Sequence, residues 1–475
     1  RILIDAGVGP GCAVGVTLDR SAELVAAWWA VLKAGGTYVP VDRTHPVERI
    51  ATVPNSVRAV TVLTTGADTV AGAGTRPVLR IDTVDLSGVT GDALTDADRP
   101  AALGIDDTAY VIFTSGSTGR PKGVLWRQSD TYVSSMVGAD HESAAEIHTK
   151  VAGNTGAPWF AVSPLMHAAG LWTVFSGALA GLPVVVYDDR ARFDPQRVWQ
   201  TAEREKAGLM TMVGDAYAAP LIVELQRRDY DLASLYAIGT GGAATNPRHV
   251  AALLEKLPHV TIINGYGSSE TGNMGFGHNQ RGSHRETFDL REGGTVVSED
   301  LSRFVEPGEA EVGWVVRVGR IPLGYFDDPV ATQKTFPVVD GVRVVVSGDR
   351  ASLESDGTLR LFGRDSLVIN TGGEKVFVEE VEAVLRAQPG VVDALVVGRD
   401  SERWGQEIVA LVQKAPEAVV DSDTLRAACA AELARFKAPK EFVFVEQVRR
   451  LGNGKADYRW AKSHVAQQGN LAVQP

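Results

Sequence analysis

The chain has 475 residues, enough for two or three domains of about 100 to 200 residues each. Apolar residues make up 44% of it and charged residues 22%, as is typical of a globular protein. The formal net charge of −11 argues against a nucleic-acid partner, because binding to a duplex needs a basic face.

The cysteine content and the apolar stretches indicate the compartment. Two cysteines, Cys12 and Cys429, stand far apart and form no CxxC pair. We therefore expect a reducing, cytoplasmic location, with both thiols serving as small buried apolar side chains. The apolar stretch Leu24 to Leu32 is much shorter than the roughly 20 residues of a membrane span, so no transmembrane segment is expected. Because the chain begins at Arg1, we expect that part of the natural N-terminus is missing.

In the first two-thirds of the chain, short β-branched runs alternate with helical stretches, which is typical of βαβ units around a mostly parallel sheet. Helices are predicted at Ala22–Lys33, Pro195–Glu205 and Ala216–Gln226. Strands are predicted at Ala13–Leu18, Thr37–Val41, Ala109–Phe113, Trp159–Val162, Val184–Tyr187, Leu209–Val213, Leu235–Gly239 and Val260–Asn264.

From about Gly313 onward, hairpin-like pieces replace this alternation. The predicted strands there are Val342–Val346, Ala351–Glu354 and Thr358–Phe362, with the turn dipeptide Asp356-Gly357 between the last two. After Arg364 we expect helices at Val378–Arg386 and Leu425–Ala434, and strands at Val391–Val397 and Ile408–Val412. The expected fold class is therefore α/β. A large N-terminal domain (1–364) of βαβ-type sheets carries a small β-barrel-like module, and a small mobile α+β C-terminal domain (367–475) follows it.

The strongest chemical signal is the segment Tyr110–Val124, which reads YVIFTSGSTGRPKGV. A buried strand leads into a loop of small residues that offers many backbone N–H groups and hydroxyls, with Lys122 adding a positive charge. Such a loop can wrap a polyphosphate. It is not a Walker A loop, because no Gly-Lys-Ser/Thr ends it at the required spacing. The alternative of a flexible surface loop is disfavoured by its position directly after a buried strand.

This segment resembles the phosphate loop of the adenylate-forming enzymes, which include acyl-CoA synthetases, peptide-synthetase adenylation domains and luciferases. The resemblance runs from Gly11 to Lys462. It implies an enzyme that uses ATP to convert a carboxylic acid into an acyl-adenylate and pyrophosphate, then passes the acyl group to a thiol. With coenzyme A as the thiol, the products are acyl-CoA and AMP. The other matching motifs, in the family's order, are Leu32–Asp42, Pro164–Gly170, Tyr266–Gly272, Ser347–Arg350, Gly363-Arg364 and Gly452–Lys455.

The resemblance also implies roles for single residues. Glu270 is the expected Mg²⁺ ligand, because Mg²⁺ prefers carboxylate and phosphate oxygens, and Thr271 is expected to donate to the α-phosphate. His167 and Trp172 are expected at the acyl pocket, although His167 fits a hydrogen-bonded core histidine equally well. No second His or Cys at ligand spacing supports zinc. The remaining residues expected to bind ATP or coenzyme A are Thr114, Ser115, Gly116, Ser117, Thr118, Gly119, Lys122, Gly242, Ala243, Tyr266, Asp349, Arg364, Gly372, Gly373 and Lys375.

Lys455 is the residue expected to catalyse the first step. Attack of a carboxylate on the α-phosphate builds negative charge, and a fixed ammonium would stabilise that charge most in the transition state. The resemblance further implies that the small domain then rotates about a hinge at Ser366 and presents the Thr371–Lys375 loop for thioester formation. The family more often has Asp or Lys at the hinge position.

One residue and three segments bear on which carboxylic acid and which thiol the enzyme would use. Peptide-synthetase adenylation domains bind the substrate ammonium with an aspartate where this chain has Ala168, which disfavours an α-amino acid. Asn370–Val376 and Gly454–Trp460 resemble CoA ligases for fatty and sterol-derived acids, whereas Leu32–Asp42 is closer to peptide synthetases. A ligase that loads a carrier protein therefore stays an alternative. An alternative from another functional class is a non-catalytic nucleotide-binding regulator. Under this hypothesis, some of the expected site residues would be replaced.

Overall fold

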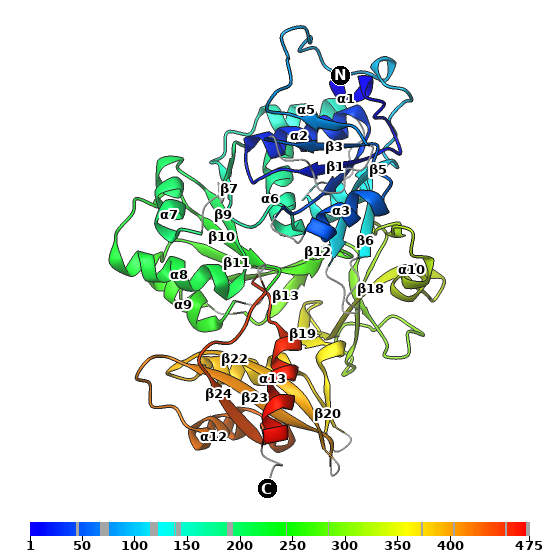
Figure 1. Ribbon diagram of the computed structural model, residues 1–475. Helices are drawn as coiled ribbons and strands as arrows, with labels where there is room; N and C mark the ends of the chain where they lie inside the picture. The colour runs from blue at the N-terminus through cyan, green and yellow to red at the C-terminus, as the bar shows by residue number, and fades with distance from the viewer. Residues whose placement is uncertain are drawn as a thin grey trace.

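Three β-sheets follow one another along the computed structural model, from the N-terminal end of the molecule to the C-terminal end (Figure 1). The structure describes residues 1–43, 47–66, 76–114, 122–136, 138, 144–187, 193–243, 245–283, 285–371, 374–401, 404–451 and 454–471.

The first sheet has seven strands in the order β16-β6-β5-β2-β1-β3-β4. Its centre is parallel, whereas β5 and β6 form an antiparallel hairpin. The bounds are β1 Ala13–Thr17, β2 Thr37–Pro40, β3 Thr61–Thr64, β4 Val78–Arg80, β5 Thr108–Thr114, β6 Lys122–Arg127 and β16 Gly324–Tyr325. The helices near it in the chain are α1 Ile2–Asp5, α2 Ala22–Ala34, α3 Val47–Ser56, α4 Gln128–Ser135 and α5 Ala144–Ala152.

Helix α2 shows why this part of the sequence folds as it does. Ser21 caps its first turn by accepting a hydrogen bond from the Leu24 amide at 3.3 Å, and Gly35 ends it in the left-handed conformation at φ +90°. Its apolar face reaches the next layer, where Trp28 stacks on Phe175 of α6 (Ala168–Leu179) with ring centroids 5.5 Å apart. The first core therefore lies between the first sheet, α2 and α6.

The second sheet has twelve strands in the order β14-β15-β18-β19-β13-β12-β11-β10-β9-β7-β8, with β17 paired beside β18. Its bounds are β7 Trp159–Ala161, β8 Val184–Val186, β9 Leu209–Met212, β10 Ala237–Gly241, β11 Thr261–Ser268, β12 Gly272–Asn279, β13 Thr287–Leu290, β14 Gly294–Val297, β15 Gly313–Val318, β17 Val338–Val339, β18 Val342–Leu353 and β19 Leu359–Arg364. Helices α7 Pro195–Arg204, α8 Gly214–Arg227 and α9 Pro247–Lys256 lie together on its outer side, and α10 Pro329–Thr335 lies beside β18 (Figure 1).

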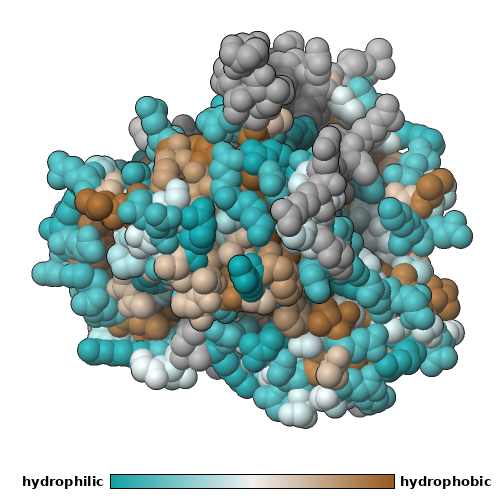
Figure 2. All heavy atoms as spheres, turned by 90° about the horizontal axis from the view of Figure 1, so that it is seen from below, coloured by the Kyte–Doolittle hydropathy of each residue, from teal (hydrophilic) through white to brown (hydrophobic). Residues whose placement is uncertain are grey.

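The third sheet belongs to a small C-terminal domain with the order β21-β20-β23-β22, and β24 pairs with β23. Helices pack on both faces of β22 and β23, so this domain has apolar cores of its own. Its surface, seen from below in Figure 2, shows apolar side chains as separate patches among hydrophilic ones. The bounds are β20 Ile369–Thr371, β21 Glu374–Val376, α11 Val378–Ala387, β22 Val391–Ser401, β23 Gly405–Lys414, α12 Ser422–Glu432, β24 Glu441–Val445 and α13 Tyr458–Leu471.

The α/β fold class with a large N-terminal and a smaller C-terminal domain is confirmed, and two local predictions were wrong. The pieces expected at Val342–Val346 and Ala351–Glu354 are one strand, β18, which carries a register shift between Arg350 and Ala351. The strand expected from Leu235 begins at Ala237, because the Leu235 amide donates to the Leu232 carbonyl in a turn. The β-rich module is continuous with the second sheet through β13, which pairs with both β12 and β19.

Candidate active site

The segment expected to bind phosphate connects the two strands of the β5–β6 hairpin. Thr114 and Lys122 are paired across it, and the Thr114 hydroxyl reaches the Lys122 carbonyl oxygen at 3.5 Å. The expected loop residues Ser115, Gly116, Ser117, Thr118 and Gly119 lie outside the described residues. A hairpin differs from the strand-to-helix turn of a Walker A loop, which agrees with the spacing of the sequence motif.

Three of the expected nucleotide-binding residues meet where β11, β18 and β19 adjoin. The Tyr266 hydroxyl donates to a carboxylate oxygen of Asp349 at 2.7 Å, and Nε of Arg364 lies 3.3 Å from the other. Burial and the charge of Asp349 raise the pKa of Tyr266 well above its usual value. Asp349 sits within β18, opposite Arg364 of β19, and not in a free turn. The carboxylate is thus held in place from two sides.

Gly242 and Ala243 follow β10, the parallel neighbour of β11. Gly241 is in register with Gly265, which places Gly242 beside Tyr266 at the carboxyl ends of two adjacent strands. Gly242 adopts φ +75°, a conformation that favours glycine. The carboxyl edge of a parallel sheet is where ligands bind in open α/β folds.

Glu270 is connected to Lys122 through an aromatic ring that the sequence analysis did not single out. The Tyr325 hydroxyl donates to a Glu270 carboxylate oxygen at 3.1 Å. Lys122 Nζ lies 5.0 Å from the centre of the same ring, a cation–π contact. The acid expected to hold Mg²⁺ and the cation expected to hold phosphate therefore share one support.

Thr271 is fully buried, and its hydroxyl already has partners. It accepts a hydrogen bond from the Ser268 amide at 2.9 Å and donates to the Gly272 carbonyl at 3.1 Å. The Thr271 carbonyl accepts from the guanidinium of Arg317, which is 2% exposed and also donates to the carbonyls of Asn273 and Glu292.

Arg317 therefore stabilises the turn that contains Glu270 and Thr271 by hydrogen bonds to its backbone and to neighbouring backbone carbonyls. Burial lowers the pKa of Arg317 to about 10, with the charge of Arg291 acting in the same direction, so the side chain stays charged at neutral pH.

The segment between β24 and α13 extends from the small domain toward β11 and β13 (Figure 1). Lys455, which belongs to this segment, lies within electrostatic reach of Glu270, Asp349 and Arg364. Gly454 packs on α8, where an added Cβ would lie 3.2 Å from the Cβ of Ala216. Arg450 fixes this segment by binding Asp393 of β22 through two hydrogen bonds of 2.8 and 2.9 Å and the Gly454 carbonyl at 3.2 Å. The lysine is thus attached to a rigid part of the small domain.

The electrostatic environment of Lys455 contains the acids expected to surround the nucleotide. Lys455 is exposed as a whole residue, yet neighbouring atoms desolvate its ammonium and lower its pKa, and repulsion from Arg364 acts in the same direction. Glu270 and Asp349 oppose this shift. Four predicted site residues from both domains, Glu270, Asp349, Arg364 and Lys455, are therefore close enough to interact.

The residues expected at the acyl pocket lie on α6. Trp172 is 6% exposed, and its indole N–H donates to the Tyr110 hydroxyl at 3.0 Å. This contact places Trp172 in the core beside β5 of the β5–β6 hairpin. His167 is the N-cap of α6, and Ala168 is buried directly after it. A role for His167 and Trp172 in the acyl pocket stays a prediction.

The hinge region connects the two domains through Glu379, a partly buried acid. Ser366 lies within a short 3₁₀ helix, Asp365–Leu367. Beside it, Glu379 of α11 accepts a hydrogen bond from the Arg364 amide at 3.3 Å, and its carboxylate approaches the α-carbon of Gly363 so closely that a methyl group there would collide. Lys375 lies on β21, whereas Gly372 and Gly373 lie outside the described residues.

Four supporting residues were missed by the sequence analysis: Tyr325, Arg317, Glu379 and Trp126, whose indole donates to the Ser269 carbonyl at 2.8 Å. A usable signal existed for Tyr325, which stands just before the helix start at Asp328-Pro329. Arg317 interrupts an otherwise apolar strand, which also marks it as unusual. Nothing local in the sequence distinguishes Glu379 from its acidic neighbours.

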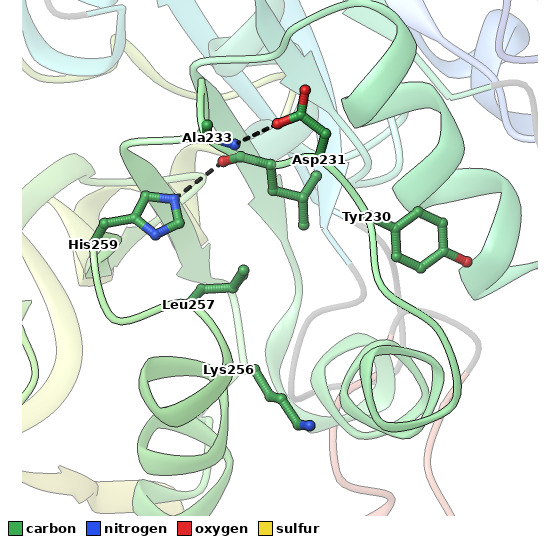
Figure 3. Close-up of a pocket in the computed structure, with 7 residues that line it drawn as sticks. Tyr230, Asp231, Ala233, Lys256, Leu257 and His259 are labelled. Atoms are coloured by element: carbon green, nitrogen blue, oxygen red, sulfur yellow. Dashed lines mark hydrogen bonds between the residues drawn. The ribbon is translucent and has the colours of Figure 1, made fainter.

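A cavity of about 470 Å³ lies away from the predicted site, between the loop that follows α8 and the end of α9 (Figure 3). Its polar groups already have protein partners: the Asp231 carboxylate accepts from the Ala233 amide and pairs with Lys206, the Tyr230 hydroxyl donates to Glu224, and the His259 ring contacts the Leu232 carbonyl. None of its lining residues belongs to the predicted site, so we assign it no ligand.

The described part of the chain carries neither a metal-binding cluster nor a helix that could span a membrane. No group of three or more His, Cys, Asp or Glu side chains there could hold a metal ion. No helix there is long and apolar enough to cross a membrane.

Comparison with known proteins identifies the family. The profile of the AMP-binding enzyme family matches residues 1–296, and that of the AMP-binding enzyme C-terminal domain matches residues 380–455. The medium-chain acyl-CoA ligase Mig of Mycobacterium avium is 42% identical over 78% of this chain and 69% of that protein. A Mycobacterium marinum ligase named for medium/long-chain fatty acids and 3-oxocholest-4-en-26-oate is 34% identical over 98% of this chain and 89% of its own length.

Solved structures share the fold at lower identity. The amide bond synthetase McbA of Marinactinospora thermotolerans superposes with a TM-score of 0.80 at 23% identity and covers 98% of this chain and 92% of its own. ATP-bound MatB of Rhodopseudomonas palustris superposes with a TM-score of 0.78 at 20% identity over 98% and 90%. The chain belongs to the AMP-binding, adenylate-forming enzyme family, and its relatives at 34–42% identity are CoA ligases.

Replacing Arg317 tests whether it supports the Glu270–Thr271 turn. Arg317 reaches the carbonyls of Thr271 and Asn273 through one nitrogen and that of Glu292 through another, whereas Arg317→Lys carries all of its donors on a single nitrogen. We therefore expect at least one of these carbonyls to lose its donor, and each buried acceptor left without one costs about 1–3 kcal/mol. We expect a lower melting temperature and a slower adenylation step with AMP affinity nearly retained. Arg303→Lys, at a half-exposed arginine paired with Glu309 and Glu311, is the control and should change neither. Wild-type behaviour of Arg317→Lys would contradict the assignment.

Glu379 predicts a pH dependence of stability. Burial raises the pKa of Glu379 to about 7, and repulsion from Glu382 and Asp349 adds to this shift. Because the folded-state pKa exceeds that of the unfolded chain, ionisation of Glu379 destabilises the native state above about pH 7, and this penalty disappears as the pH falls toward the unfolded-state value.

Glu379→Gln should therefore raise the melting temperature at pH 8 and leave it nearly unchanged at acidic pH, as followed by thermal melts at both pH values. The neighbouring Glu380→Gln removes an ion pair with Lys437 of 2.7 Å and should raise stability at neither pH. Equal shifts for Glu379→Gln at both pH values would count against a buried, partly protonated carboxyl.

Proposed function

We propose that this protein is an ATP-dependent acyl-CoA ligase that joins medium- or long-chain fatty acids, or acids of sterol side chains, to coenzyme A. The proposal rests above all on one observation: the segment that carries Lys455 of the small domain packs on Val213 and Ala216 of the large one through Gly454. Lys455 is there within electrostatic reach of Glu270, Asp349 and Arg364. The names of the relatives, ligases for fatty acids and for 3-oxocholest-4-en-26-oate, supply the substrate class.

In the first step, ATP would enter the space in front of the β5–β6 hairpin, with adenine between Tyr266 and Gly242 and the ribose hydroxyls donating to Asp349. Asp349 suits this task because Tyr266 and Arg364 already fix its carboxylate. Lys455 would then stabilise the charge that builds as the carboxylate attacks the α-phosphate and pyrophosphate leaves. Thr271 can donate to that phosphate only by exchanging its bond to the Gly272 carbonyl.

The residues present fit a magnesium ion that arrives with ATP. Glu270 supplies one hard carboxylate, held by the Tyr325 hydroxyl, and the described residues form no metal cluster of their own. Mg²⁺ commonly binds through one or two carboxylates plus the phosphates of its substrate. When bound, it neutralises phosphate charge. Glu270 would hold it, and Lys122 would face the same phosphates.

In the second step, the small domain (367–475) would rotate relative to the large one (1–364) about Ser366 and bring the Thr371–Lys375 loop to the acyl-adenylate. This proposal is supported by the polar contacts that join the domains. Asn246 and Arg248 donate to the carbonyls of Arg386 and Val392 at 3.2 and 3.0 Å, so the interface includes hydrogen bonds that water can replace.

Coenzyme A is the favoured acceptor, because the CoA ligases match this chain at 34–42% identity, whereas a peptide synthetase, a plipastatin synthase of Bacillus subtilis, matches at 26%. The buried Ala168 offers no partner for a substrate ammonium. A carrier protein stays the alternative acceptor. A non-catalytic regulator is disfavoured because Lys122, Glu270, Asp349, Arg364 and Lys455 are all present. We propose a cytoplasmic location, where ATP and coenzyme A are available.

The test is a pyrophosphate-release screen of the purified protein with ATP and Mg²⁺ across fatty acids of increasing length, sterol side-chain acids, aromatic acids and amino acids. Activity with fatty or sterol acids and none with amino acids is expected. Each active acid is then combined with either coenzyme A or a phosphopantetheinylated carrier protein. Acyl transfer to the carrier alone would overturn the proposed acceptor, and no pyrophosphate release with any acid would overturn the enzyme assignment.

Lys455→Ala should lower the rate of acyl-adenylate formation by about 10²-fold or more, the scale found when an electrostatic stabiliser of a transition state is removed. ATP binding, measured by calorimetry, should change little. The control is Lys462→Ala, at an exposed lysine on α13 that should have no effect on either measurement. Pyrophosphate release by Lys455→Ala at the wild-type rate would exclude this role for the lysine.

A further inference from the structure

A cavity of about 370 Å³ lies between the β-rich part of the large domain and the start of the small one. Carboxylates and an arginine of the large domain border it on one side, and a lysine of the small domain borders it on the other. The cavity exists only while the domains keep this orientation, because its walls come from both sides of the proposed hinge. Its lining residues are Glu299, Ala310, Glu311, Val312, Arg350, Lys375 and Phe377.

One carboxylate in this cavity connects the two domains. Glu299, which follows β14, accepts a hydrogen bond from Arg350 of β18 at 2.9 Å. It also forms a short ion pair with Lys375 on β21 of the small domain. The hydrogen bond from Lys375 lowers the pKa of Glu299, with the charge of Arg350 acting in the same direction, so the carboxylate is charged at neutral pH.

The large-domain side of this contact is rigid. Arg350 is 2% exposed, and its guanidinium lies 4.4 Å from the centre of the Trp314 ring. The Trp314 indole N–H donates to the Glu299 carbonyl at 2.9 Å, which holds the backbone of that residue as well. Arg350 also lies 3.8 Å from Asp365, the residue before the proposed hinge. Glu299 is therefore presented to Lys375 from a fixed position.

We propose that Glu299 is a positioning residue for the adenylate-forming step: by holding Lys375, it favours the domain orientation in which Lys455 lies near Glu270 and Asp349. The inference rests on the proposed function. Because Lys375 belongs to the segment proposed to meet coenzyme A, the same ion pair must open before thiol transfer. Glu299 thus favours the first half-reaction at the expense of the second.

The expected effect is modest, since both side chains keep contact with water. The side chain of Glu299 is 58% exposed and that of Lys375 47%. Exposed ion pairs are typically worth up to about 1 kcal/mol, which corresponds to a population change of about fivefold at most. A change of this size is measurable when the two half-reactions are followed separately.

The experiment compares wild type, Glu299→Gln and Glu311→Gln. Glu311 lines the same cavity but pairs with Arg303 within the large domain at 2.7 Å, so it is the matched control. Adenylation is measured as pyrophosphate release in a single turnover without coenzyme A. Thiol transfer is measured as acyl-CoA formation from a prepared acyl-adenylate and coenzyme A. Lys375 is left intact because it is itself expected to act in the second step.

We expect Glu299→Gln to slow adenylation about two- to fivefold, with thiol transfer unchanged or faster. High salt should slow wild-type adenylation toward the mutant rate and affect the mutant less, since exposed ion pairs are screened. Glu311→Gln should match wild type in both half-reactions. Wild-type adenylation by Glu299→Gln, or an equal loss in both half-reactions, would overturn the inference. A wild-type protein without pyrophosphate release would instead overturn the proposed function.

Discussion

Lys455 lies near the predicted nucleotide site because the segment that carries it packs against α8 of the large domain. Gly454 allows this close approach, since an added Cβ would lie 3.2 Å from the Cβ of Ala216. The proposed site therefore does not exist within either domain alone. Its acids and the β5–β6 hairpin come from the two large sheets, and the lysine proposed to act in adenylation comes from the small domain. The proposed chemistry depends on how the domains are oriented as much as on which residues they contain.

The charges of the site are arranged so that a polyphosphate would complete them. Arg364 and Lys455 repel each other, while Glu270 and Asp349 partly compensate. An anionic ligand placed among these groups would relieve the repulsion between the cations. Neighbouring side chains hold the two acids: Tyr266 contacts Asp349, Tyr325 contacts Glu270, and Arg317 holds the turn that carries Glu270. Such preorganisation is what transition-state stabilisation by fixed charges requires.

The sequence was sufficient to predict the family and the fold class, because the matching motifs run along nearly the whole chain in the family's order. It also picked out Tyr266, Asp349 and Arg364, which the structure brings together, while their contact with a ligand stays a prediction. It was insufficient for residues that act through a long-range contact. Glu379 is one of several acids at the start of α11, and only its approach to Gly363 sets it apart. Likewise, β18 is one continuous strand where two were predicted, with a register shift between Arg350 and Ala351. Its continuity depends on pairing with β15 and β19, which no local sequence pattern encodes.

The two hydrogen bonds between Arg450 and Asp393, together with the contact to the Gly454 carbonyl, fasten the lysine-bearing segment to the sheet of the small domain. If the small domain rotates as proposed, Lys455 would move with it as part of one unit and would need no local rearrangement of its own segment. Substitutions in this domain far from Lys455 would then alter the rate of adenylation by changing the domain orientation, without touching any group that meets the substrate. Sequence differences among related ligases outside the active site would then change the relative rates of adenylation and thiol transfer.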